Sequence, residues 1–212
     1  MSNNKAKFVT FEGGEGVGKS TQIVLFSEFL SSKGIENIVT REPGGTYGAE
    51  FLRSAFLSGE YEWDVVSELM LVMAARRDHM VHKILPTLDS GVWVLCDRFI
   101  DSSVVYQGVL RGMPEQWVVD MHRVAGMYLE PDLTIILSVS AKVAMQRKFE
   151  CAREKLNRFD SMSEEKHETV CAAYKKICTN NQHRCAFIDG FGSALDVAEL
   201  VVSAANLLLT LK

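Results

Sequence analysis

One eight-residue segment near the amino terminus constrains the fold more than any other feature. It reads Gly13-Gly14-Glu15-Gly16-Val17-Gly18-Lys19-Ser20. This GxxxxGK[ST] pattern follows the strand-like segment Phe8–Glu12 and precedes the amphipathic segment Thr21–Leu30. Glycines in such a turn let successive backbone N–H groups and the positive end of the following helix face an anion. The sequence therefore predicts a phosphate-binding P-loop over residues 13–20, with a glycine-rich structural turn as the alternative.

The residues at the end of the loop predict what it binds. Lys19 is expected to reach the β- and γ-phosphates of a nucleoside triphosphate, and Ser20 to provide a hydroxyl ligand for Mg²⁺. The predicted ATP-binding residues in this segment are Gly13, Gly14, Glu15, Gly16, Val17, Gly18, Lys19, Ser20 and Thr21. The loop alone does not identify the acceptor of the phosphate.

Short apolar, β-branched segments alternate with longer helical patterns along the chain. The predicted strands are Phe8–Glu12, Asn37–Thr40, Val92–Asp97, Leu133–Val139 and Ala186–Asp189. Alternating strands and helices imply an α/β fold of the P-loop NTPase type, a mostly parallel five-stranded sheet with helices on both faces. Ligands are then expected at the carboxyl ends of the strands. No repeat or linker divides the 212 residues, so we predict a single domain over 1–212.

Composition favours a soluble globular protein. The chain is 47% hydrophobic with a net charge of −4, and it contains no apolar run of the about 20 residues that span a bilayer. The polar residues 1–7 do not resemble a signal peptide, so we expect a cytoplasmic protein with no membrane partner. The mildly acidic balance also argues against a nucleic-acid partner.

The five cysteines are odd in number and have no CxxC spacing, which favours reduced thiols. Cys171 and Cys178 fit one buried or half-buried helical face, and Cys185 lies at the start of a strand. A metal site among the cysteines is the alternative.

A basic segment follows the fourth predicted strand. Residues 141–160 contain Arg147, Lys148, Arg153, Lys155 and Arg158. This segment is either a solvated charged helix or a helical lid that closes on phosphates, and its position after a strand end favours the lid. No NKxD guanine-reading segment is present. A water-excluding lid suits a nucleotide or nucleoside kinase.

Two further motifs narrow the acceptor. Residues 40–46 read TREPGGT and residues 97–108 read DRFIDSSVVYQG. With FEGGEG at 11–16, they resemble the bacterial type of thymidylate kinase, a P-loop nucleoside-monophosphate kinase, over about residues 8–160. The resemblance implies Mg²⁺-dependent transfer of phosphate from ATP to dTMP, giving dTDP, in a homodimer. The alternative is another deoxynucleotide or deoxynucleoside kinase with a different acceptor.

The motif after the third strand offers groups for a phosphate and a metal ion. Asp97 can hold Mg²⁺ or its water shell, and Arg98 offers a planar fork for the acceptor phosphate. A strand-end Asp-Arg salt bridge is the alternative. The resemblance implies that Arg98 and Arg53 contact the monophosphate.

Two carboxylates are also assigned by the resemblance. It implies that Glu15 reaches the 3′-hydroxyl or the metal's water shell, and that Glu42 lies beside the sugar and phosphate. Either could instead pair with Arg41 or Lys19.

The resemblance also implies contacts to the nucleoside. Ser103 and Gln107, one helical turn apart, would hold the base, Tyr106 would crowd the sugar 2′ position, and Arg76 would donate to a thymine carbonyl. The alternative for Arg76 is an exposed helix arginine. Ser102, which precedes Ser103, could be only a helix cap. Val72 occupies the position where the family has a base-stacking phenylalanine, with Met73 or Phe51 as possible substitutes.

Gly16 leaves no arginine inside the P-loop. The resemblance then assigns the transfer arginine to the lid, where we favour Arg153 for transfer and Arg147 for ATP contacts, with Arg158 also available. The predicted catalytic residues are Lys19, Arg98, Arg153 and Glu15. Two apolar stretches, Val65–Met73 and Trp117–Val124, fit either a dimer interface or the core.

Overall fold

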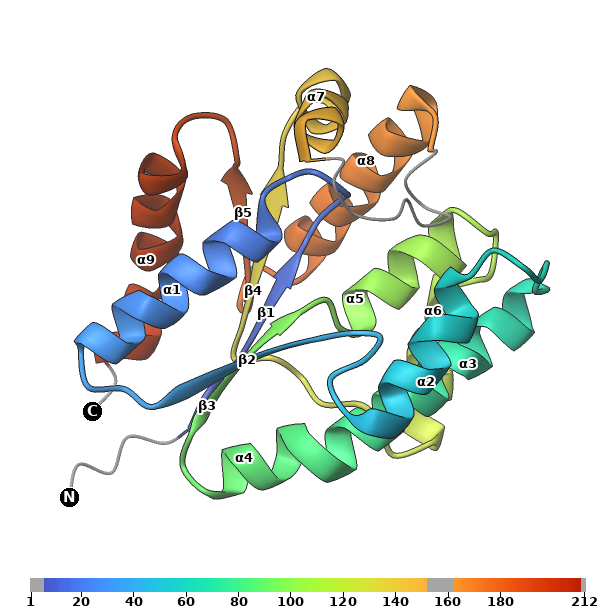
Figure 1. The fold of residues 1–212 in the computed structure, drawn as a ribbon, viewed down its shortest axis with the longest axis horizontal. Helices are drawn as coiled ribbons and strands as arrows, with labels where there is room; N and C mark the ends of the chain where they lie inside the picture. The colour runs from blue at the N-terminus through green and yellow to red at the C-terminus, as the bar shows by residue number, and fades with distance from the viewer. Residues whose placement is uncertain (1–5, 152–161, 211–212) are drawn as a thin grey trace.

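The computed structural model describes residues 6–151 and 162–210, without the side chains of 148–151 and 210 (Figure 1). Its strands are β1 (Phe8–Glu12), β2 (Asn37–Arg41), β3 (Trp93–Asp97), β4 (Leu133–Ser138) and β5 (Cys185–Asp189). They form one sheet in the order β2-β3-β1-β4-β5, and every pairing is parallel. The predicted five-stranded parallel sheet is confirmed, with each strand end within one residue of its expected position.

Helices cover both faces of this sheet, as predicted. The α-helices are α1 (Lys19–Ser32), α2 (Tyr47–Leu57), α3 (Val65–His79), α4 (Leu85–Asp89), α5 (Ile100–Ser103), α6 (Glu115–Val124), α7 (Ala141–Cys151), α8 (Glu164–Asn180) and α9 (Ala194–Thr210). Two π-helical segments, η1 (Met80–Ile84) and η2 (Val104–Val109), continue α3 and α5. No helix among the described residues is long and apolar enough to cross a bilayer.

Strand alternation creates a separate core on each face. In β1, Phe8 belongs to a cluster with residues of α3, α6 and α8, whereas Val9 and Phe11 pack with residues of α1 and α9. Successive side chains of a strand point to opposite faces, so a fully buried β1 supplies both cores. Figure 1 shows α1 and α9 together on one side of the sheet.

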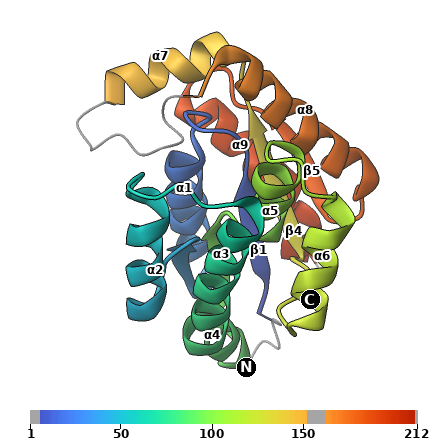
Figure 2. The same ribbon diagram turned by 90° about the vertical axis from the view of Figure 1, so that its right-hand side faces the viewer.

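The parallel register brings the sequence motifs together at the end of the sheet where the strands have their carboxyl termini. Asp97 at the end of β3 pairs with Phe11 of β1 and with Arg41 of β2. The loops that follow these three strands therefore leave the sheet side by side. In both views, α7 lies at the same end, near the turn from β1 into α1 (Figure 2).

The helix after β3 differs from the regular helix expected. It changes from α to π geometry at Val104, so Ser103 ends the α-helical part and Gln107 lies in the π-helical part. The wider π turn rotates the residues after Ser103, and the two side chains bond to different partners, described below. Such π segments occur often at functional sites.

Candidate active site

The P-loop lies tightly against β4. Gly13 has φ 133°, and a Cβ atom there would collide with the carbonyl group of Leu137. Lys19 begins α1 and folds back over the loop, donating to the carbonyls of Gly14 at 2.7 Å and Gly13 at 3.3 Å. Burial and the nearby Arg98 lower the pKa of Lys19. The lysine ammonium group is thus held over the loop, where a phosphate anion would stabilise its charge.

Ser20 and Asp97 form a candidate magnesium site. Ser20 Oγ lies 3.4 Å from Asp97 Oδ2. The other carboxylate oxygen, Asp97 Oδ1, is buried and has no hydrogen-bond partner among the described residues. A buried acceptor without a partner calls for an explanation, and a carboxylate beside a hydroxyl is an oxygen set that Mg²⁺ prefers. These residues therefore fit the ion that the sequence predicts.

Arg98 joins β3 to the P-loop. Its guanidinium donates to Glu15 Oε1 at 2.7 Å and to Gly13 O at 3.0 Å, and it lies over the Tyr106 ring at 5.1 Å. Its backbone has φ 72°, a conformation uncommon for a residue with a side chain. Strained backbone of this kind persists where the surrounding structure fixes it. The alternative prediction of a strand-end salt bridge between Asp97 and Arg98 is wrong, because Arg98 forms its ion pair with Glu15.

The buried carboxylate of Glu12 holds the backbone that follows Arg98, a role that the sequence analysis did not predict. Its carboxylate accepts from Phe99 N at 2.7 Å, Ser102 Oγ at 2.6 Å and Tyr174 Oη at 2.8 Å. Burial, with a further contribution from Asp101, raises the pKa of Glu12 to about 7. The only available signal was an acidic residue at the end of an otherwise apolar strand.

Ser102 and Arg53 complete the surroundings of Arg98. Ser102 lies inside α5 and contacts Arg98 Nη1 at 3.1 Å, so the suggestion that it is only a helix cap is wrong. Arg53 donates to Pro43 O at 2.7 Å. Burial and Arg41 lower the pKa of Arg53, and Asp97 and Arg98 are also close enough to influence it. Arg53 and Arg98 thus belong to one electrostatic neighbourhood.

Glu42 is buried between two cationic or hydrogen-bonding partners. Its Oε2 lies 2.5 Å from Arg76 Nε and its Oε1 lies 3.0 Å from His79 Nδ1. Burial alone would raise the pKa of Glu42, but Arg76 and His79 outweigh it and lower the pKa. The suggested pairing of Glu42 with Arg41 or Lys19 is wrong, since Arg41 pairs with Glu50 at 2.9 Å and Lys19 bonds to the loop carbonyls.

Arg76 lies inside the molecule. It is only 2% exposed, so the alternative of an exposed helix arginine is wrong. Its Nη1 lies 3.0 Å from Ser103 Oγ, which joins two of the residues predicted to hold the base. Gln107 instead donates to Glu68 Oε1 at 2.7 Å.

The expected stacking position is apolar and buried. Val72 and Met73 are 6% and 7% exposed, whereas Phe51 is 73% exposed. Tyr106, expected beside the sugar, is also buried and lies against Arg98. Met73 therefore shares the buried environment of Val72, and Phe51 does not.

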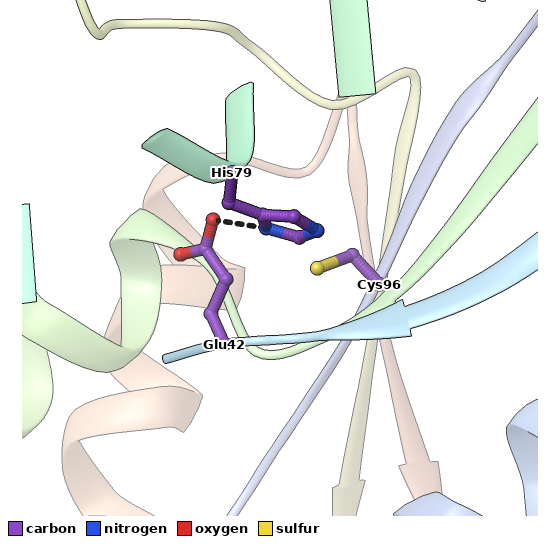
Figure 3. Close-up of side chains that lie close together, drawn as sticks. All are labelled: Glu42, His79 and Cys96. Atoms are coloured by element: carbon purple, nitrogen blue, oxygen red, sulfur yellow. Dashed lines mark hydrogen bonds and ion pairs between the residues drawn. The ribbon is translucent and has the colours of Figure 1, made fainter. Parts of the chain in front are cut away.

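Glu42, His79 and Cys96 form a buried cluster whose potential ligand atoms lie within 4.8 Å of one another (Figure 3). Sequence spacing gave no signal for it because the three residues come from separate elements. Each ligand atom is engaged: His79 Nε2 lies 2.7 Å from Thr40 Oγ1, and Cys96 Sγ donates to Arg98 O at 3.1 Å. Burial raises the pKa of the Cys96 thiol, which disfavours the thiolate that a metal requires. The cluster is best described as a hydrogen-bonded support for Glu42.

The lid prediction is only partly covered by the described residues. Arg147 on α7 donates to Gly190 O at 3.0 Å, and its Nη1 lies 3.8 Å from the position of a Cβ built on Gly18. Arg147 is thus next to the P-loop. Arg153, Lys155 and Arg158 lie outside the described residues, as does the side chain of Lys148.

Comparison with known proteins identifies relatives over almost the whole chain. The sequence profile of the family described as Thymidylate kinase matches residues 11–201. A thymidylate kinase of Afipia carboxidovorans is 43% identical over 199 residues, covering 93% of this chain and 87% of the relative. One of Rhizorhabdus wittichii is 37% identical over 204 residues, covering 95% and 98%. The crystal structure of thymidylate kinase from Ehrlichia chaffeensis superimposes with a TM-score of 0.75 at 30% identity, covering 93% and 97%.

Proposed function

Because the chain belongs to the thymidylate kinase family, we propose that it transfers the γ-phosphate of ATP to dTMP, yielding ADP and dTDP. Among the residues of this chain, the position of Arg98 gives the strongest support for this proposal. A guanidinium held by Gly13 and Glu15 at the mouth of the P-loop is suited to bind a phosphate that accepts the transferred group.

Catalysis in this site rests on alignment and charge. Lys19 and the loop amides hold the triphosphate, while Arg98 and Arg53 hold the acceptor phosphate beside it. A phosphate oxygen is already anionic, so the site needs no strong general base. Glu15, which holds Arg98 in the present structure, would position that arginine and the sugar 3′-hydroxyl when dTMP binds.

Ser20 and Asp97 would hold Mg²⁺. The ion supplies neutralisation of charge on the phosphate oxygens during transfer. The buried Asp97 Oδ1, for which the described part of the chain offers no hydrogen-bond partner, supports this assignment.

Residues 141–160 form the proposed lid of a single domain spanning 1–212. Arg147 would contact ATP, consistent with its position beside Gly18. Arg153 would stabilise the charge on the transferred phosphoryl group, a role that Gly16 cannot fill.

The base would be held by Arg76, Ser103 and Gln107, and Tyr106 would favour deoxyribose. Base stacking on an aromatic ring is worth about 1–3 kcal/mol in single-strand binders. Val72 cannot supply it, so thymine recognition would depend more on hydrogen bonds than on stacking.

We also propose a cytoplasmic homodimer. The two apolar stretches divide between core and surface: Val118 is fully buried, whereas Met70 and Trp117 are 56% and 62% exposed. Exposed apolar side chains on α3 and α6 would supply the interface.

A coupled assay of ADP release tests the proposed activity. Turnover with dTMP should exceed turnover with dUMP, dCMP, dGMP and dAMP under identical ATP and Mg²⁺ concentrations. Equal or faster turnover of another monophosphate would contradict the assignment of dTMP as the acceptor.

A further inference from the structure

Arg76 has nearly all of its donors committed to the protein. A guanidinium carries five N–H groups. Nε donates to Glu42, the two Nη1 hydrogens face Ser103 Oγ and His122 Nε2, and one Nη2 hydrogen faces Phe99 O at 3.0 Å. The second Nη2 hydrogen has no partner among the described residues. One N–H therefore remains for a substrate.

His122 is the unexpected member of this set. It comes from α6, is 0% exposed, and its Nε2 lies 2.5 Å from Arg76 Nη1. Its Nδ1 lies 2.6 Å from the carbonyl oxygen of Val118. Because a carbonyl only accepts, Nδ1 must carry the proton, and Nε2 must then be the acceptor for Arg76.

The charges around His122 maintain this neutral tautomer. Burial, followed by the positive charge of Arg76, lowers the pKa of His122 to about 4, against the weaker opposite effects of the Val118 carbonyl and Glu42. The histidine thus remains an acceptor at neutral pH and does not compete with Arg76 as a second cation.

We propose that His122 is a positioning residue for acceptor-base recognition: it binds one Nη1 hydrogen of Arg76 and fixes the guanidinium so that its single remaining Nη2 hydrogen meets a base carbonyl. This rests on the proposed function, in which Arg76 contacts the base. Thymine has a carbonyl oxygen at C4, where cytosine has an amino group. A single fixed N–H donor can bond to the thymine carbonyl oxygen but not to the cytosine amino group, which is itself a donor. His122 therefore contributes to the preference for dTMP over dCMP.

Two variants of the full-length chain test the proposal. His122→Leu removes the acceptor at similar volume and is expected to raise KM for dTMP about tenfold, the loss of one buried hydrogen bond. Its kcat and its KM for ATP should stay within about twofold, and its preference for dTMP over dCMP should fall by about the same tenfold. His122→Gln keeps an acceptor and should retain KM for dTMP within about threefold. His183→Leu, at an exposed histidine, is the matched control.

A double-mutant cycle separates positioning from general stability. In an Arg76→Met background, His122→Leu should change KM for dTMP by less than about twofold, because its effect acts through Arg76. A folded His122→Leu enzyme with unchanged KM and unchanged preference overturns the proposal, as does full additivity in the cycle. Where the leucine variant does not fold, a folded His122→Gln enzyme with a tenfold higher KM overturns it. A wild-type protein with no dTMP turnover contradicts the proposed function instead.

Discussion

Arg98 Nη2 donates to Glu15 Oε1 across 2.7 Å, which links the end of β3 to the middle of the P-loop. The proposed ATP-binding and acceptor-binding parts of the site are therefore joined by an ion pair that is largely buried. In the proposed function, the acceptor phosphate binds the guanidinium that Glu15 positions. This relationship makes Arg98 the residue whose removal most directly separates acceptor binding from ATP binding.

Replacement of Arg98 should impair use of the monophosphate. We expect Arg98→Asn to lower kcat/KM for dTMP by at least about 100-fold, because two charge-assisted hydrogen bonds to phosphate are lost. Asparagine tolerates the positive φ at this position better than other residues with side chains. KM for ATP should change less than about threefold. Steady-state kinetics with Arg77→Ala as the exposed control measure the difference, and an equal loss for ATP would argue against the assigned role.

Removal of a charge at Asp97 should alter the magnesium requirement. Asp97→Asn is expected to raise the Mg²⁺ concentration for half-maximal activity about tenfold, since one anionic ligand becomes neutral. Titration of Mg²⁺ at saturating ATP and dTMP measures this shift. Asp89→Asn is the control, because Asp89 is exposed and lies at the end of α4, before β3 begins. An unchanged Mg²⁺ requirement would remove Asp97 from the metal site.

Single substitutions in the lid should distinguish its arginines. Arg153→Ala should lower kcat by about 10³-fold with little change in KM for dTMP, as expected for an arginine that stabilises the transferred phosphoryl group. Arg147→Ala should mainly raise KM for ATP. If Arg158→Ala rather than Arg153→Ala produces the large loss in kcat, Arg158 is the transfer arginine and the assignment of Arg153 is wrong.

Much of this site follows from the sequence because its determinants are local. The P-loop, the TREPGGT segment and the Asp97-Arg98 pair each lie at the carboxyl end of a strand, and a parallel sheet brings such ends together. The support of Arg76 does not follow, because His122 lies 46 positions away on another helix. Its proximity depends on how α3, α5 and α6 pack, and no periodicity encodes that.

The proximity of His79 to Arg76 could have been predicted from the sequence more easily than that of His122. His79 lies three residues after Arg76 on α3, a spacing that places both near one face. The change to π geometry at Val104 left no comparable signal in the sequence. In the structure, η2 packs against α6 and α8. Local chemistry was therefore predictable, whereas the buried network that supports it was not.

Gly45 should be intolerant of a side chain because His79 and Thr40 pack against it. It has φ 91°, and a Cβ atom would overlap the His79 ring and Thr40 Oγ1. Gly45→Ala is expected to lower the free energy of unfolding by about 3 kcal/mol or more, combining backbone strain and overlap. Gly34→Ala is the matched control, with φ 72° and no atom within 4 Å, and should cost about 1 kcal/mol. Equal losses in urea unfolding would show that the His79 packing is not restrictive.

Glu12 should make stability depend on pH. Its folded pKa of about 7 lies above the ordinary value of 4.5, so the folded state binds the proton more tightly. Its contribution to stability is therefore present below pH 4.5 and is lost as pH rises to about 7. Relative to Glu12→Gln, the wild-type free energy of unfolding should fall by about 3 kcal/mol at most across this range.

The comparison with the variant is necessary because His122 acts in the opposite direction. Its folded pKa of about 4 lies below the ordinary 6.5, so its contribution is lost as pH falls from 6.5 to 4. Urea unfolding of both proteins at several pH values between 4.5 and 8 isolates the Glu12 effect. A wild-type minus variant difference that does not change with pH would contradict the raised pKa.

Product analysis tests the central claim most directly. The full-length protein is incubated with ATP, Mg²⁺ and either dTMP or thymidine, and the nucleotides are separated and quantified. The account predicts equal amounts of ADP and dTDP from dTMP and no phosphorylation of thymidine, because Arg98 and Arg53 require an acceptor phosphate. Formation of dTMP from thymidine, without conversion of dTMP to dTDP, would contradict it.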